Sequence, residues 1–261
     1  MDVLIVLAVA LLASGLTLFS GFGLGTLLMP AFALVFPVPV AIAATAIVHL
    51  ANNLFKLALL GRHANWAVAA RFGIPAAIAA VFGAGALVGI AASGAVLEYS
   101  AIGRSWSVTP AQLVIGLLIV AFAILELSGR LEKVAMPASL MPLGGAISGF
   151  FGGLSGIQGE LRSAFLIKAG LDKHAFVATG VVAAVMVDTV RITIYGATFL
   201  SAGPETLGRD SAGLVAVACL AAFTGAFAGS RLLGKATLKG LHRVVAVTMI
   251  AIGLALAAGI V

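Results

Sequence analysis

Apolar runs of bilayer-spanning length follow one another along nearly the whole of this 261-residue chain. Hydrophobic residues make up 62% of the sequence and charged residues 9%, against roughly 25% charged residues in an ordinary soluble domain. A membrane-spanning helix needs about 17 to 25 mostly apolar residues. The runs are continuous and rich in Ala, Leu and Gly, whereas membrane-barrel strands alternate. The sequence therefore predicts an all-α integral membrane protein, a polytopic transmembrane helical bundle in which strands are not expected.

Ten apolar segments can be distinguished along the chain. They are 2–20, 22–36, 39–61, 66–93, 109–128, 137–153, 157–169, 173–199, 210–233 and 241–261. The second and seventh are short, and turns rich in Pro or Gly end both of them. The first segment carries no Lys or Arg ahead of its apolar core, so we expect a retained transmembrane helix and not a cleaved signal.

A glycine-broken turn occurs twice, ahead of each short segment. The first is Ser20-Gly21-Phe22-Gly23-Leu24-Gly25, and the second is Ser155-Gly156-Ile157-Gln158-Gly159. A short apolar stretch, a turn, a threonine (Thr45, Thr179) and a longer helix follow each. Broken backbone inside lipid needs protein or water to satisfy its polar groups, so paired breaks predict a transport site. We expect one membrane domain of two five-segment repeats, 1–130 and 131–261, each with one short broken helix.

The distribution of Lys and Arg predicts the orientation. If all ten segments cross, only Arg104 and Arg209 fall on one side of the membrane. The other side collects Arg62, Arg71, Arg130, Lys133, Lys168, Lys173, Arg231, Lys235, Lys239 and Arg243. The positive-inside rule places these ten in the cytoplasm and both termini outside. Five crossings per repeat invert the second repeat, so the positive starts of the two short helices approach each other and predict an anion site.

Four polar side chains share one stripe of the third segment, because His49, Asn52, Asn53 and Lys56 are spaced i, i+3, i+4, i+7. Polar groups at membrane depth usually face a protein interior or a cavity, which favours a binding role. The alternatives are that Lys56 extends to the nearby interface, that the asparagines join helices, and that His49 only packs between helices.

The eighth segment carries Asp188, Arg191 and Tyr195 at i, i+3, i+7. Asp188 and Arg191 could form a structural bridge, or Arg191 could present its fork to an oxyanion while Asp188 holds it or takes a coupling proton. Gln158, Glu160 and Arg162 open the seventh segment. In the first turn Glu160 interacts favourably with the positive end of the helix dipole, but its charge would repel a bound anion. It is either a local ion-pair partner or a functional acid.

Several classes of protein are excluded or disfavoured. The sequence has no Walker A, dinucleotide-binding, zinc-protease or nucleophile-elbow motif, so we expect neither an enzyme nor ATP-driven transport. Its four histidines are scattered and Cys219 is the single cysteine, so no metal site is expected. The net charge of +6 is attributed to loops beside anionic lipid and not to nucleic-acid binding. Gly-x-x-x-Gly spacings are compatible with a homodimer without defining its interface.

The residues around the two breaks resemble the TauE/SafE sulfite exporter family. The resemblance lies in Gly152-x-x-Ser155-Gly156-x-x-Gly159, in Gly21-Phe22-Gly23-Leu24-Gly25 followed by Pro30, and in the threonine of each following helix. It covers essentially the whole chain as two halves. It implies a carrier in the bacterial inner membrane for sulfite or small organosulfonate anions, without a cofactor.

We therefore expect a secondary transporter that moves sulfite or a C2 organosulfonate such as sulfoacetate by alternating access. A carrier or channel for another inorganic or carboxylate anion is the alternative, followed by a membrane scaffold. The expected partners are the anion and the lipid bilayer. The expected substrate-binding residues are Gly21, Gly23, Gly25, His49, Asn52, Asn53, Lys56, Ser155, Gly156, Gln158, Gly159, Arg162 and Arg191. The candidates for proton coupling are His49, Glu160 and Asp188.

Overall fold

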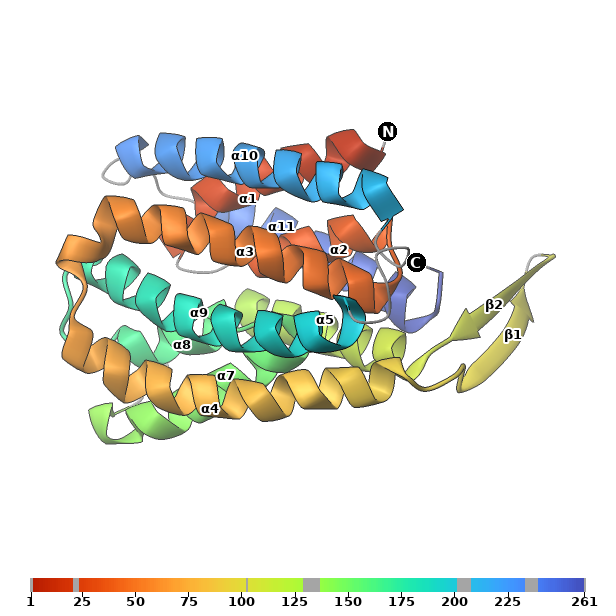
Figure 1. Ribbon diagram of the computed structural model, residues 1–261, viewed down its shortest axis with the longest axis horizontal. Coiled ribbons are helices and arrows are strands. Elements are labelled where there is room, and N and C mark those ends of the chain that lie inside the picture. Colours follow the sequence, from red (N-terminus) through yellow and green to blue (C-terminus); the bar gives the residue numbers. More distant parts are fainter. Residues whose placement is uncertain are drawn as a thin grey trace.

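The body of the molecule is a bundle of helices whose axes are roughly aligned, some of them parallel and others antiparallel (Figure 1). The computed structural model describes residues 2–20, 24–101, 103–128, 137–200, 208–232 and 239–260. The helices of the first half are α1 (Asp2–Ser20), α2 (Leu24–Ala33), α3 (Val38–Leu60), α4 (Trp66–Ala91) and α5 (Pro110–Ser128). Those of the second half are α7 (Met141–Ser155), α8 (Gly159–Leu166), α9 (Lys173–Tyr195), α10 (Gly208–Leu232) and α11 (Lys239–Ala257). The predicted all-α class is confirmed.

Helices of the two halves pack against each other in pairs. α1 lies against α10, α4 against α7, α5 against α11 and α3 against α9. A 3-10 turn, η1 (Gly61–His63), ends α3 beside the start of α9, where the rings of His63 and His174 lie 5.4 Å apart. α3 and α9 therefore run in opposite directions. The labelled N and C ends lie at the other end of the bundle (Figure 1).

Glycines let α7 press directly on the backbone of α4. A Cβ atom on Gly145, Gly149 or Gly153 would lie 2.1, 2.0 or 2.4 Å from the carbonyl oxygens of Phe72, Ala76 and Ala80, respectively. Such close approach requires residues without a side chain. The residue numbers of the glycines in α7 and of their contacts in α4 increase together, so the two helices run parallel. α7 ends near the middle of α4.

The short helices α7 and α8 form the two limbs of a hairpin. α7 starts at the end of the bundle where α4 starts, and α8 leads back to the start of α9 at that same end. The structure thus differs from ten full crossings, because this pair reaches only about halfway along α4 and returns. Among the described residues, five helices are long and apolar enough to cross a membrane. Two half-crossings return the chain to the same side as two full ones, so the predicted grouping of the cations is unaffected.

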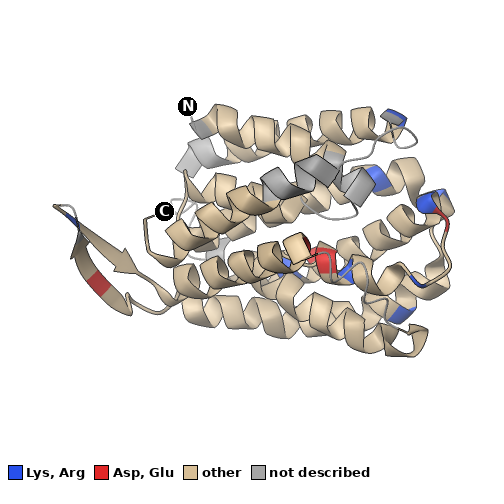
Figure 2. Ribbon diagram, turned by 180° about the vertical axis from the view of Figure 1, so that it is seen from behind, with Lys and Arg blue, Asp and Glu red and all other residues tan. Residues whose placement is uncertain are grey.

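Apolar side chains cover the outside of the bundle, while several charged side chains are buried in its middle. Leu4, Phe82 and Leu220 are 70%, 68% and 62% exposed, whereas Asp188 and Arg191 are fully buried. This arrangement suits a lipid solvent and identifies a multi-pass membrane protein. Figure 2 shows Lys and Arg gathered at the end of the bundle opposite to the termini, apart from those in its middle and one on the β-hairpin.

A small antiparallel hairpin projects from the end that holds the termini (Figure 1). Its strands are β1 (Leu97–Ala101) and β2 (Arg104–Val108), and Gly103 adopts a φ of 73° in the turn between them. The Tyr99 hydroxyl fixes the hairpin to the bundle by donating to the Ala258 carbonyl at 2.6 Å. The expectation of no strands was wrong here, since it was drawn from membrane-length runs and the hairpin lies between two of them.

Asp172 caps α9 outside the membrane-spanning segments. Its carboxylate accepts hydrogen bonds from the backbone N–H groups of His174 and Ala175, both at 2.9 Å. The bond from Ala175 is the largest cause that holds the pKa of Asp172 below its usual value, and the bond from His174 and the two nearby histidines add to it. The charged form is therefore the one that stabilises the helix start.

Replacing Asp172 with alanine is expected to lower the melting temperature at pH 7. A carboxylate whose pKa is lowered by folding contributes stability above its unfolded pKa of about 3.9, and this contribution is lost as the pH falls through the folded pKa. The difference in melting temperature between Asp172→Ala and the parent should therefore shrink between about pH 5 and pH 3. Glu98→Ala, which removes an exposed carboxylate in β1, is the control. An equal difference at pH 3 and pH 7 would contradict the charged cap.

Candidate functional site

The two glycine breaks meet in the interior of the bundle. A Cβ atom on Gly25 would lie 2.9 Å from the carbonyl oxygen of Gly156 and 3.7 Å from the His49 ring. Gly25 belongs to the first turn of α2, and Gly156 is the junction between α7 and α8. The predicted meeting of the two breaks is thus observed from Gly25 onward, while Gly21 and Gly23 lie outside the described residues.

The junction Ser155–Gly159 is held in place by a set of local bonds. Gly156 ends α7 in the left-handed conformation, with a φ of 81°, and its N–H donates to the Gly152 carbonyl at 2.9 Å. Glycine is the residue that adopts this conformation without strain. The Ser148 hydroxyl donates to the Gln158 carbonyl at 3.0 Å, and the Tyr195 hydroxyl donates to the Gly153 carbonyl. The sequence Gly-Ile-Gln therefore forms a fixed turn within the protein.

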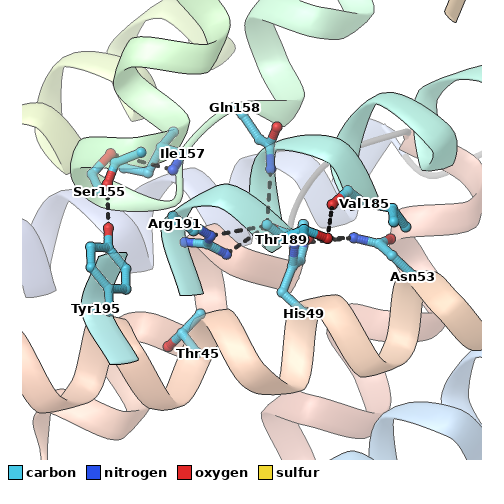
Figure 3. A network of polar contacts seen from close by, with 12 residues as sticks. Thr45, His49, Asn53, Ser155, Ile157, Gln158, Val185, Thr189, Arg191 and Tyr195 are labelled. Atoms are coloured by element: carbon cyan, nitrogen blue, oxygen red, sulfur yellow. Dashed lines mark hydrogen bonds and ion pairs between the residues drawn. The ribbon is translucent and has the colours of Figure 1, made fainter. Parts of the chain in front are cut away.

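Asp188 lies at the centre of a buried network that joins α3, α9 and the junction. Figure 3 labels its four partners in this network, His49, Asn53, Gln158 and Arg191. Its Oδ1 pairs with Arg191 through Nε at 3.0 Å and Nη2 at 2.9 Å, and it accepts from Gln158 at 3.3 Å. Its Oδ2 contacts His49 Nδ1 at 2.6 Å and accepts from Asn53 at 3.0 Å. Since a carboxylate only accepts, His49 carries its proton on Nδ1. The interpretations of Asp188 and Arg191 as a structural pair and as part of the site are compatible.

Arg191 also presents an unused donor to the junction. Its Nη1 lies 2.6 Å from the place that a Cβ on Gly156 would occupy, and it is buried without a hydrogen-bond partner among the described residues. Any side chain at position 156 would displace the guanidinium. Glycine at position 156 therefore has two structural roles: it adopts the left-handed conformation of the turn, and it leaves space for the Arg191 guanidinium beside the junction.

A second polar group surrounds Lys56, which is 1% exposed. The Asn52 amide is assigned from its neighbours, with its oxygen accepting from Lys56 Nζ at 3.1 Å and its nitrogen donating to the Ala222 carbonyl at 3.2 Å. Ser14 of α1 contacts the same amide. Lys56 is thus held inside the bundle, which is at odds with the alternative of an interfacial lysine.

Glu160 and Arg162 lie in the first turns of α8, where the second half meets the first. The Thr26 hydroxyl of α2 donates to Glu160 Oε1 at 3.1 Å. Arg162 is 6% exposed and approaches the backbone of α9, since its Nε lies 3.3 Å from the place of a Cβ on Gly180. These contacts connect α2, α8 and α9 around the junction.

The site carries an excess of buried positive charge. Lys56, Arg162 and Arg191 face only two buried carboxylates among the described residues, Glu160 and Asp188, and none of the five is more than 6% exposed. Unbalanced buried charge is costly in a protein and more so within a bilayer. An anion of one or two charges would relieve it. The electrostatics of this arrangement therefore favour a bound anion.

Most of the predicted site residues are brought together, and several others had no predicted role. His49, Asn53, Gln158, Asp188 and Arg191 form one network, whereas Asn52 and Lys56 form the neighbouring group. The Ser155 hydroxyl donates a hydrogen bond to the Phe151 carbonyl of its own helix and accepts one from the Ile157 N–H. The residues without a predicted role are Ser14, Thr26, Ser148 and Tyr195. Of these four, the sequence indicated only Tyr195, because its spacing places it on the same helical stripe as Asp188 and Arg191.

The fold and the site define a class, that of polytopic helical membrane proteins whose broken helices meet around buried charge. Within that class, the family model of sulfite exporter TauE/SafE matches residues 6–256. The chain therefore belongs to the TauE/SafE family, as the resemblance predicted, and membership implies a membrane exporter of sulfite or a related anion. No curated protein and no solved structure matches the chain.

Proposed function

We propose that this protein is a secondary transporter that carries sulfite or a C2 organosulfonate such as sulfoacetate by alternating access. The observation that carries the proposal is the site with three cations and two carboxylates where the glycine breaks meet. A sulfonate offers three oxygens and a fixed negative charge, which matches converging donors and excess positive charge. Transport by a secondary carrier needs no cofactor and no enzymatic step.

In the proposed site, Arg191 and Lys56 balance the charge of the anion. The free Nη1 of Arg191 and the backbone N–H groups after the breaks donate to its oxygens, with Arg162 nearby. His49, Asn53 and Gln158 hold Asp188, and through it they fix the orientation of the guanidinium. Arg191 can therefore pair with Asp188 through Nε and Nη2 and still donate from Nη1 to the anion.

We propose further that residues 1–130 and 131–261 are inverted repeats. Two observations support this: α3 and α9 are antiparallel, and α1 with α10 repeats the pairing of α7 with α4. Gly116 of α5 and Gly253 of α11 support it too, because each faces the carbonyl of the other, at 2.5 and 2.9 Å from the added Cβ. Inverted repeats that exchange conformations open the site to one side and then to the other.

The proposed location is the bacterial inner membrane, with the η1 end in the cytoplasm and both termini in the periplasm. The support is the cluster of Lys and Arg at that end of the bundle (Figure 2). The β-hairpin would then project into the periplasm.

Calorimetric titration of the purified protein tests the proposed function. Sulfite and sulfoacetate should bind, and taurine should bind at least about tenfold more weakly because its ammonium group meets Lys56 and Arg191. A ligand held at about 100 times its dissociation constant should stabilise the protein by about 2.7 kcal/mol, which thermal unfolding can verify. If carboxylates or other inorganic anions bind while sulfite and sulfoacetate do not, the substrate assignment is wrong. A lack of stabilisation by all of them would favour a scaffold.

A further inference from the structure

Glu160 carries a buried carboxylate of which only one oxygen has a hydrogen-bond partner among the described residues. The residue is 4% exposed, its Oε1 accepts from Thr26, and its Oε2 has no such partner. Asp188 differs in this respect, since both of its oxygens are engaged by neighbouring donors. A proton on Asp188 would displace one of these donors, whereas Glu160 has an unoccupied oxygen that can receive one.

The carboxylate of Glu160 lies where the two halves meet. Thr26 and Glu160 each belong to the first turn of a short helix that follows a glycine break. They are separated by 134 residues, the same separation as that between Thr45 and Thr179. The contact therefore joins corresponding positions of the two halves, at the helix starts to which an anion would bind.

A bound anion and an ionised Glu160 would repel each other in this buried place. Adding one proton to Oε2 converts the carboxylate into a neutral acid and leaves the bond from Thr26 to Oε1 intact. The excess positive charge of Lys56, Arg162 and Arg191 is then available to the anion. When the anion leaves, the proton can leave as well, and the carboxylate again offsets part of that charge.

We propose that Glu160 binds one proton together with the transported anion, so that the two are carried in the same direction. This inference rests on the proposed function and adds its coupling ion. Arg162 on α8 is the charged group that acts electrostatically on Glu160. The charged and titratable groups buried in the neighbouring part of the bundle are His49 and Lys56 on α3 and Asp188 and Arg191 on α9. The packed helices α2 and α7 carry none. His49 already donates its Nδ1 proton to Asp188, and in the proposed site the three cations balance the charge of the anion. Glu160 is therefore the group to which we assign the coupled proton.

Titration calorimetry in two buffers of different ionisation enthalpy tests the proposal. The probe is sulfoacetate, whose charge does not change between pH 6 and pH 8, unlike that of sulfite. The parent protein should take up about one proton per bound anion, and its affinity should rise by up to about tenfold per unit fall in pH. Glu160→Gln should bind the anion with no proton uptake and a flat pH profile. Glu98→Gln, in the exposed hairpin, should behave as the parent.

The other outcomes separate this inference from the proposed function. Binding by the parent without proton uptake would overturn the coupling and leave the transporter intact. Proton uptake that persists in Glu160→Gln would assign the proton to another group. A parent that binds neither sulfoacetate nor sulfite would remove the basis of both proposals.

Vesicles that contain the protein and a pH-sensitive dye give a second measurement. An inward sulfoacetate gradient should acidify the interior with the parent and with Glu160→Asp, which keeps an acid at this position. With Glu160→Gln, sulfoacetate should enter without acidification. If Glu160→Gln cannot be purified in folded form, a Glu160→Asp variant that moves the anion without protons would overturn the proposal.

Discussion

Arg191→Gln is expected to lower the affinity for sulfoacetate by at least about 100-fold, which corresponds to about 2.7 kcal/mol. Hydrogen bonds to charged groups are worth about 1.5 to 3 kcal/mol each, and the variant loses both the charge and the free Nη1 at the junction. Glutamine is shorter and neutral, so neither the Coulomb attraction nor the forked geometry is replaced. Titration calorimetry with purified parent and variant measures the difference.

The variant is expected to fold because Asp188 keeps other donors. His49, Asn53 and Gln158 still donate to its two oxygens after Arg191 is removed. Arg191→Lys should give an intermediate affinity, since it restores the charge without the fork. Arg71→Gln makes the same chemical change at an exposed position of α4 and should bind as the parent does. An Arg191→Gln protein with the parent's affinity would exclude Arg191 from the anion site.

The buried residues of α3 and α9 could be predicted from the sequence. A charge in lipid is so unfavourable that the sequence favoured interior positions for Asp188 and Arg191, and helical spacing indicated which neighbours share their stripe. For Lys56 the sequence left an interfacial position open, and the structure shows it buried. The pairing of Asp188 with Arg191 also follows, because these residues are one turn apart on the same helix. The cost of exposed charge, together with the helical period, is therefore enough to locate most of the buried charged residues.

The partners from other segments could not be predicted. His49, Asn53 and Gln158 reach Asp188 from α3 and from the junction, and Thr26 reaches Glu160 from the opposite half. Helical periodicity does not relate residues on different helices, so tertiary packing decides which of them meet. The depth of α7 has a similar cause: fifteen mostly apolar residues have similar hydropathy whether they end at the middle of a bilayer or cross it. What distinguishes the two is the contact of α7 with α4.

That contact gives the second large effect, which is on folding. Gly149→Ala is expected to destabilise the protein by about 3 kcal/mol or more, because the added methyl group would lie 2.0 Å from the Ala76 carbonyl oxygen and 2.5 Å from two further backbone atoms of Ala76. Backbone atoms cannot rotate away as a side chain can, so α7 must separate from α4 along the stripe that also includes Gly145 and Gly153. Thermal unfolding and size-exclusion chromatography in detergent measure the loss.

Gly85→Ala is the matched control, because it makes the same change within α4 at a position where the added Cβ would meet no atom within 4 Å beyond the adjoining backbone of its own helix. Alanine is favoured over glycine in a helix interior by about 0.5 to 1 kcal/mol, so this variant should be as stable as the parent or slightly more so. The two substitutions are identical in chemistry and in intrinsic helix preference. A difference between them therefore measures the packing of α7 on α4. Equal stability of the two variants would mean that α7 does not contact α4 through its backbone, and the position of the junction beside Arg191 would then lose its support.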